Sequence, residues 1–125
     1  MLKKIQGQIL NNLDNVISSL LLSNNLVNIA YDGSIKSGFP YESTKRFNAP
    51  ATLVDLDGDG DLEIIAGNDD GLLHVLHHDG TEMTSYDVGD DIRGGISVAD
   101  LNDDGSYELL FTSYDDMIHV WNPID

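Results

Sequence analysis

The stretch VDLDGDGDLEIIAGNDDGLLHV, residues 54–75, decides the fold because a second copy of it follows in the same chain. The copy is ADLNDDGSYELLFTSYDDMIHV, residues 99–120, and the two align without a gap. Asp100 stands 45 positions after Asp55, and this offset holds throughout. Identical residues occupy the pairs Asp55/Asp100, Leu56/Leu101, Asp59/Asp104, Gly60/Gly105, Glu63/Glu108, Asp70/Asp115, His74/His119 and Val75/Val120. Agreement over this length indicates an internal repeat.

A third copy precedes these two and is weaker. The same offset, applied toward the N-terminus, places Asn12 and Asp14 at two of the acidic positions. Apolar or hydroxyl residues replace other carboxylates there, so this loop is interpreted as degenerate. Residues 31–34, YDGS, resemble residues 78–81, HDGT, at a slightly larger offset. The chain therefore contains nearly three repeats.

Short apolar runs within each repeat predict strands, since clusters of Gly and Asp separate them. In the middle repeat the predicted strands cover residues 51–54, 62–66, 72–76 and, more weakly, 83–88. A period of about 40 to 50 residues built from short strands is typical of propeller blades, which bury their faces against neighbouring blades. A helix over residues 9–22 is the alternative for that segment, but its Asn and Ser content disfavours it.

The predicted fold class is therefore all-β, with β-propeller-type blades in nearly three four-stranded repeats of about 45 residues. One partial propeller spans residues 1–125, which is too short a chain for two comfortable domains. Its parts are a degenerate blade at residues 1–48, a calcium-loop blade at 49–93 and an incomplete calcium-loop blade at 94–125 that lacks its outer strand.

The first acidic loop, DLDGDGDLE at residues 55–63, predicts a calcium site. Carboxylates at loop positions one, three, five and nine supply hard oxygen ligands, and calcium takes 6 to 8 of these. Glycine allows the backbone conformations that a tight turn around the ion requires. The predicted ligands are the side chains of Asp55, Asp57, Asp59 and Glu63 and the carbonyl oxygen of Asp61.

The second acidic loop predicts a weaker calcium site. Its ligands are the side chains of Asp100, Asn102, Asp104 and Glu108 and the carbonyl oxygen of Ser106. Asn102 retains an oxygen but removes one negative charge, which lowers the expected affinity. The number of protein oxygens disfavours magnesium, and neither loop contains the His or Cys that transition metals prefer. Recurrence of the loop argues against a merely solvated acidic turn.

The spacing separates these loops from the EF-hand, which needs a Glu at position twelve, where this chain has Ala66 and Phe111. The pattern resembles the calcium loops of FG-GAP and VCBS-type repeats, the blades of integrin alpha-subunit-like and many bacterial extracellular propellers. The resemblance rests on residues 50–54 followed by DLDGDGDLEIIAG, then Asp70-Gly71 and the Asp79-Gly80 turn. It covers residues 49–125 well and residues 1–48 loosely. It implies that each acidic loop joins adjacent strands of one blade and holds calcium.

Composition restricts the partners. The formal net charge is -16, with 6 Lys and Arg against 22 Asp and Glu, which disfavours nucleic acid and anionic membranes. There is no Cys, hence neither a disulfide nor a thiolate metal site. The basic N-terminus is interrupted by polar residues and is interpreted as folded chain rather than an export signal. No apolar run approaches the roughly 20 residues that span a bilayer.

Histidine and aromatic residues suggest two other functions. His74, His77 and His78 suggest zinc, but positions 74 and 77 point to opposite faces of a strand. The recurrence of His74 as His119 favours a packing or hydrogen-bonding role. The aromatic residues of the last repeat are interpreted as packing rather than as a sugar-binding platform. They are Phe111, Tyr114 and Trp121.

The expected function is a non-enzymatic, calcium-stabilised structural, adhesive or self-assembling module. The alternative is a fragment of a larger propeller lectin or propeller enzyme, since a propeller fold does not determine function. Extracellular or cell-surface location is expected, because millimolar calcium fills sites of about 10⁻⁴–10⁻³ M affinity. Because the last repeat lacks its outer strand, a homo-oligomer or filament through blade edges is expected, with residues 1–5 as a candidate exchanged strand. A glycan or protein ligand stays open.

Overall fold

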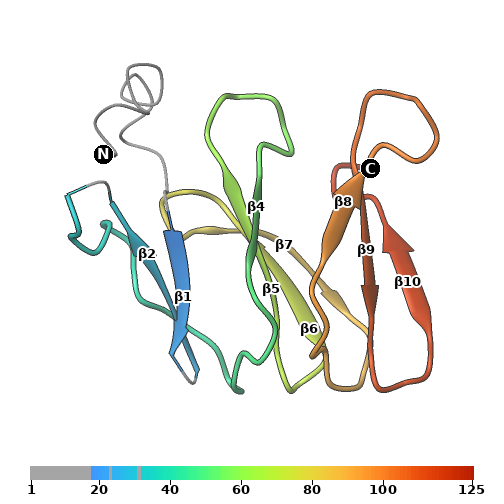
Figure 1. Cartoon of the computed structure of the whole chain (residues 1–125), viewed down its shortest axis with the longest axis horizontal. Coiled ribbons are helices and arrows are strands. Elements are labelled where there is room, and N and C mark those ends of the chain that lie inside the picture. Colours follow the sequence, from blue (N-terminus) through green and yellow to red (C-terminus); the bar gives the residue numbers. More distant parts are fainter. Residues whose placement is uncertain (1–17, 23, 31) are drawn as a thin grey trace, which may run out of the picture.

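The computed structural model describes residues 18–22, 24–30 and 32–125. Within these ranges the chain forms ten β-strands and no helix, arranged as three antiparallel sheets that follow one another along the sequence (Figure 1). The described residues thus contain no helix of the length and hydropathy needed to cross a membrane. The all-β prediction is confirmed.

The middle sheet contains four strands in sequence order. These are β4 (Thr52–Val54), β5 (Glu63–Gly67), β6 (Leu72–Leu76) and β7 (Glu82–Asp87). All four predicted strands lie within one residue of these bounds. Every residue of β5 is buried, because sheets cover both of its faces. A strand buried on both faces takes a continuous apolar run, and Ile64, Ile65 and Ala66 supply one.

The two outer sheets are smaller in the described part of the chain. The last contains β8 (Ser97–Ala99), β9 (Glu108–Thr112) and β10 (Ile118–Trp121), in the order β10-β9-β8. Among the described residues, no strand takes the place of β7 in this sheet. The first contains β1 (Ser18–Leu22), β2 (Asn25–Ile29) and the two-residue β3 (Tyr41–Glu42). The alternative of a helix over residues 9–22 is wrong for residues 18–22, which form β1.

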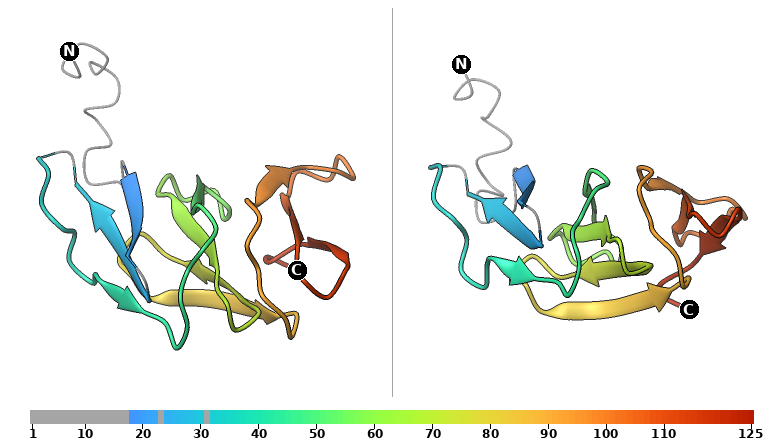
Figure 2. Two further views of the ribbon diagram at one scale, coloured as in Figure 1. Left: turned by 60° about the horizontal axis from the view of Figure 1, so that its bottom comes forward. Right: turned by 90° about the horizontal axis from the view of Figure 1, so that it is seen from below.

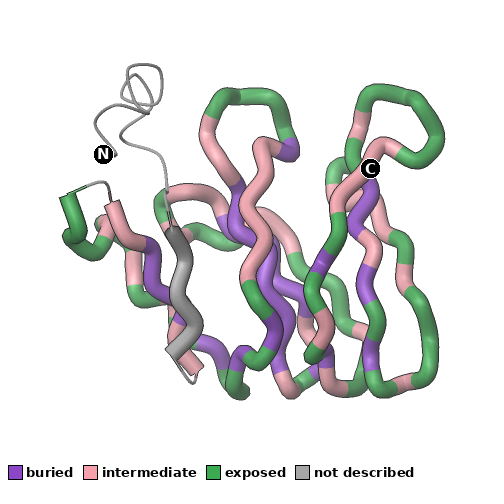
Figure 3. The backbone as a smooth tube through the Cα atoms, in the orientation of Figure 1, coloured by how far each residue is buried: buried purple, intermediate pink, exposed green. Residues whose placement is uncertain are grey.

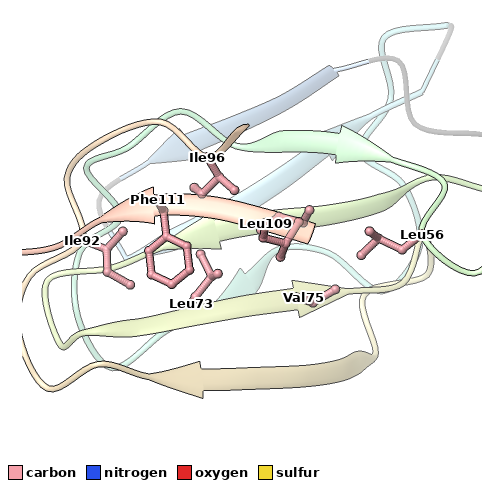
Figure 4. Packing of buried hydrophobic residues seen from close by; sticks show 8 residues of the cluster. Leu56, Leu73, Val75, Ile92, Ile96, Leu109 and Phe111 are labelled. Atoms are coloured by element: carbon pink, nitrogen blue, oxygen red, sulfur yellow. The ribbon is translucent and has the colours of Figure 1, made fainter. Parts of the chain in front are cut away.

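The middle sheet is packed between the other two, and the side views in Figure 2 show the three sheets succeeding one another. Because side chains alternate along a strand, β4, β5 and β6 of the middle sheet contribute residues to two cores. One core joins the middle and last sheets and includes Leu73, Val75, Leu109 and Phe111 (Figure 4). The other joins the first and middle sheets through Leu26, Phe47, Ile64, Ala66 and Leu76.

A polar network also ties the first sheet to the middle one. The Tyr41 hydroxyl on β3 donates a hydrogen bond of 2.8 Å to Glu82 Oε2 on β7 and lies 3.2 Å from His74 Nδ1 on β6. Burial and the neighbouring Glu82 carboxylate raise the pKa of Tyr41 to about 12. His74 therefore has a hydrogen-bonding and packing role, as its recurrence in the sequence predicts.

The turn predicted from the YDGS and HDGT segments recurs with the same hydrogen bonds. Asp32 Oδ1 accepts from Ser34 N at 2.9 Å and from Ser34 Oγ at 2.6 Å, and Asp79 Oδ1 accepts from Thr81 at the same two distances. Glycine follows each aspartate, at φ 88° and 87°. The second of these turns lies against Gly38, whose backbone contacts Asp79 and Gly80.

Two expectations fall outside the described residues. One is the degenerate loop at Asn12 and Asp14, and the other is the exchanged strand at residues 1–5. Both stay predictions.

Candidate metal centre

The two acidic loops occupy equivalent places. The loop over residues 55–62 connects β4 to β5, and the loop over residues 100–107 connects β8 to β9. Both project from the same end of the molecule, the upper end in Figure 1. Figure 3 shows that the tips of both loops are exposed, whereas β5 and most of β9, which follow the loops, are buried. Gly58, Tyr107 and Ile124 are among the residues lining a cleft of about 490 Å³ between the loops.

The backbone of the first loop wraps around its own carboxylates. Gly58 N and Gly60 N donate to the two carboxylate oxygens of Asp55, at 2.7 and 3.0 Å. Asp59 N donates to Asp57 Oδ1 at 3.1 Å, and Asp61 N donates to Asp59 Oδ1 at 2.8 Å. Each bond leaves the carboxylate with further acceptor capacity. The aspartates at loop positions one, three and five are therefore oriented by the chain itself.

The second loop repeats this arrangement. Gly105 N donates to Asp100 Oδ2 at 2.8 Å, Asp104 N to Asn102 Oδ1 at 3.1 Å and Ser106 N to Asp104 Oδ1 at 2.8 Å. Asn102 Nδ2 also donates to Asp104 Oδ2 at 2.9 Å, a bond that the first loop cannot make. Asp103 takes a φ of 62° where the first loop has a glycine at φ 79°. Two sequences that differ at several positions thus adopt one loop conformation.

The last acidic residue of each loop lies at its base. Leu56 N donates to Glu63 Oε2, and Leu101 N donates to Glu108 Oε2, both at 2.8 Å. The Glu63 side chain is 0% exposed, and burial raises the pKa of its carboxyl above the usual 4.5, partly offset by the bond from Leu56. A buried carboxylate is costly unless a cation or donor compensates it.

The aspartates of the first loop converge. One oxygen each of Asp55, Asp57 and Asp59 lies within 4.8 Å of the others, and so do ligand atoms of Asp57, Glu63 and His77. Among the described residues, both groups of three or more acidic or histidine side chains that could hold a metal ion lie in this loop and its base. Carboxylates this close repel by about 1 kcal/mol per pair at 4 Å in water, and more where water is excluded.

Sequence reasoning missed His77. Its Nδ1 lies 3.5 Å from Glu63 Oε1, although the loop itself contains no histidine. Ile64 on β5 pairs with Leu76 on β6, so Glu63, the first residue of β5, lies opposite His77, which directly follows β6. Asn122 stands 45 positions later, and its Nδ2 donates to Glu108 Oε1 at 3.3 Å. His77 and Asn122 thus occupy the same place in successive repeats, and each lies beside the glutamate at the base of its loop. The repeat offset of 45 residues relates the two positions in the sequence.

Two predicted ligands are backbone carbonyls. Asp61 and Ser106 occupy the seventh position of their loops, and their carbonyl ligation stays a prediction. The Asp61 side chain instead approaches a histidine, with Oδ2 3.4 Å from His78 Nδ1.

His119 and the aromatic residues of the last repeat make contacts outside the two groups of possible metal ligands. His119 Nε2 is 2.8 Å from Asp115 Oδ2, and its ring stacks on Phe111 at 5.1 Å. Phe111 is buried and Trp121 stacks on Tyr86, as packing residues would. Tyr114 does not pack in a core. This residue lies in the turn after β9 and is 61% exposed, with the Arg93 guanidinium 5.0 Å from the centre of its ring.

Comparison with known proteins gives a likeness of fold. No family model and no curated protein matches the sequence. Among solved structures, the crystal structure of the computationally designed Ika4 protein is similar, with a TM-score of 0.50 and 16% sequence identity over 86% of this chain. The chain spans 65% of the length of that designed chain. At this identity the similarity concerns the fold alone.

Proposed function

We propose that the protein is a non-enzymatic, calcium-stabilised structural module of β-propeller type that works outside the cell and assembles with copies of itself. The observation that carries this proposal is the repeated conformation of the two acidic loops. In both, backbone amides orient the side chains at positions one, three and five, and a glutamate at the base accepts from the residue at position two.

The donor set suits calcium. Asp55, Asp57, Asp59 and Glu63 present only oxygen atoms, and a carbonyl at Asp61 adds a fifth oxygen. Calcium tolerates the irregular geometry of such a loop better than magnesium does, since magnesium demands a near-octahedral shell. A divalent ion would also offset the mutual repulsion of the aspartates and the burial of Glu63.

The propeller type is supported by sheet order and packing. Each sheet is an antiparallel meander, and the middle sheet buries both faces against its neighbours. Blades of a propeller are related in this way. Extracellular or cell-surface location follows from the weak affinity expected of exposed loops, which millimolar calcium fills.

Thermal unfolding in calcium and in chelator tests the proposal. Each occupied site adds about 2.7 kcal/mol to the free energy of unfolding at a calcium concentration 100 times its Kd. Titration calorimetry should give two ions per chain, with the loop that contains Asp57 binding more tightly than the loop that contains Asn102.

Matched variants assign each ion to its loop. Asp59→Ala should abolish the tighter site and Asp104→Ala the weaker one, because the two residues occupy the same position in their loops. An unchanged unfolding midpoint on adding calcium would refute the calcium assignment, and two ions still bound to Asp59→Ala would refute Asp59 as a ligand.

A further inference from the structure

The last sheet exposes apolar residues at the positions that the middle sheet uses to bury its core. In the middle sheet, Leu73 and Val75 are both 0% exposed. Their counterparts 45 residues later, Ile118 and Val120, are 76% and 55% exposed. The pattern extends to the acidic loops, where Leu56 is 7% exposed and Leu101 is 54% exposed.

These residues form one face of the last sheet, which we call the open face. Val120 pairs directly with Leu110 across β10 and β9, and Ile118 lies two residues earlier on the same side of β10. The opposite face carries His119 and Phe111, which meet the middle sheet through Tyr86. The open face consists of Leu101, Leu110, Ile118 and Val120.

The chain itself shows what covers such a face. The corresponding side chains of the middle sheet lie in one core with residues of the following segment (Figure 4). The covering residues are Ile92, Ile96, Leu109 and Phe111. The residues 45 positions before Ile92, Leu109 and Phe111 are Phe47, Ile64 and Ala66, and they take part in the core with the first sheet. The chain therefore makes the same kind of sheet-to-sheet contact twice. The open face is a surface of the same kind with no sheet of the described chain packed on it.

We propose that the open face docks a sheet from a second copy of this chain. Isolated exposed apolar residues are ordinary, but here three exposed ones, Leu101, Ile118 and Val120, accompany the half-buried Leu110. A second copy of the chain contains the same sheets, and sheets of this chain already pack on apolar faces like the open face. Contact between copies that is head-to-tail closes into a ring or propagates as a filament. The inference rests on the assembling module proposed above and specifies the surface that assembles.

The test compares the full chain with two lysine variants matched in charge and exposure. Val120 and Ile35 are both 55% exposed, but Ile35 lies after β2, away from the open face. Sedimentation and light scattering at about 10–100 μM in millimolar calcium and physiological salt give the mass. Those salt conditions limit long-range repulsion between the acidic chains.

The expected result is a concentration-dependent mass of at least twice 13.7 kDa for the unaltered chain and for Ile35→Lys. Val120→Lys should weaken assembly, with an apparent Kd for self-association at least tenfold higher than that of the unaltered chain. Ile118→Lys should have the same effect. Both positions are exposed, so circular dichroism should confirm that the variants stay folded.

A monomeric chain at 100 μM would overturn the inference and favour another repeat of a longer chain as the occupant of the face. Equal assembly of Val120→Lys and Ile35→Lys would overturn it too. The calcium-induced shift in unfolding midpoint, recorded on the same samples, reports on the metal sites separately. Assembly can thus fail while the calcium response persists, and the reverse outcome is equally distinguishable.

Discussion

Glu63 combines a buried side chain with a carboxylate that has little compensation from the chain. Leu56 N donates to one oxygen, but the other accepts no hydrogen bond and has His77 at 3.5 Å. Burial therefore favours the protonated form and raises the pKa. The residue proposed as a cation ligand should therefore destabilise the fold when no cation is bound.

The prediction concerns Glu63→Gln without metal. Because the folded pKa lies above the unfolded value of about 4.5, folding takes up a proton, and the stability contributed by protonation is lost as pH rises through the folded pKa. Glutamine cannot ionise and keeps an acceptor for Leu56 N. In chelator at pH 7 the variant should be more stable than the unaltered chain by about 1–3 kcal/mol, and the difference should shrink toward pH 4.5.

In millimolar calcium the order should reverse, because the variant loses a ligand. Urea unfolding of both proteins between pH 4.5 and 7 measures the two differences. A variant that is less stable than the unaltered chain in chelator at pH 7 would show that Glu63 is compensated within the fold.

At the level of single residues, the sequence predicts that the carboxylates of the first loop converge, but it does not predict that His77 lies beside Glu63. The spacing of Asp55, Asp57 and Asp59 already implies convergence, since a loop with glycine between aspartates turns tightly. His77 is fourteen positions from Glu63, and only strand pairing brings the two together. Local spacing contains no information about such a cross-strand neighbour.

Among the elements, the β2–β3 connection of the first sheet meets the β6–β7 turn of the middle sheet in a close backbone contact that needs glycine. A Cβ at Gly38 would overlap the Asp79 carbonyl oxygen, whereas a Cβ at Gly33 would meet nothing within 4 Å. Both glycines have φ near 90°. The two positions therefore share the cost of a left-handed backbone but differ in the contact with the middle sheet.

Alanine at these two positions separates the two effects. Gly33→Ala should cost about 1–2 kcal/mol from backbone strain alone. Gly38→Ala should cost at least about 1–3 kcal/mol more, because the turn of the middle repeat must move away. Chemical denaturation measures both, and equal losses would show that the contact between Gly38 and Asp79 is not maintained in solution.

The strands were easier to predict than the sheets' packing. Residues 72–76 form a strand as expected, because apolar residues are bounded there by Gly and Asp clusters. The sequence does not distinguish Val75 from Val120, since both sit in the same motif. Their exposures of 0% and 55% depend on whether another sheet follows. Burial of this kind is a property of neighbouring repeats and not of the strand.

For the whole molecule, the formal net charge of -16 acts on every element at once. The acidic loops project from one end, so their repulsion adds to that of the remaining surface (Figure 1). Self-repulsion of this size destabilises the compact state, and salt screens it over about 10 Å at 0.1 M. Two calcium ions would neutralise four charges where the carboxylates are densest.

The last prediction follows from this distribution of charge. In chelator, raising sodium chloride from about 0.05 to 0.5 M should raise the unfolding midpoint by several degrees, because screening relieves repulsion in the loops and across the surface. In saturating calcium the same change should have a smaller effect, since each loop then holds a compensating ion.

Thermal melts of Asp59→Ala, which removes one charge and one predicted site, should show an intermediate salt dependence in calcium. Potassium chloride should reproduce the sodium result, which separates general screening from weak ion binding. Equal salt dependence with and without calcium would place the dominant repulsion outside the acidic loops.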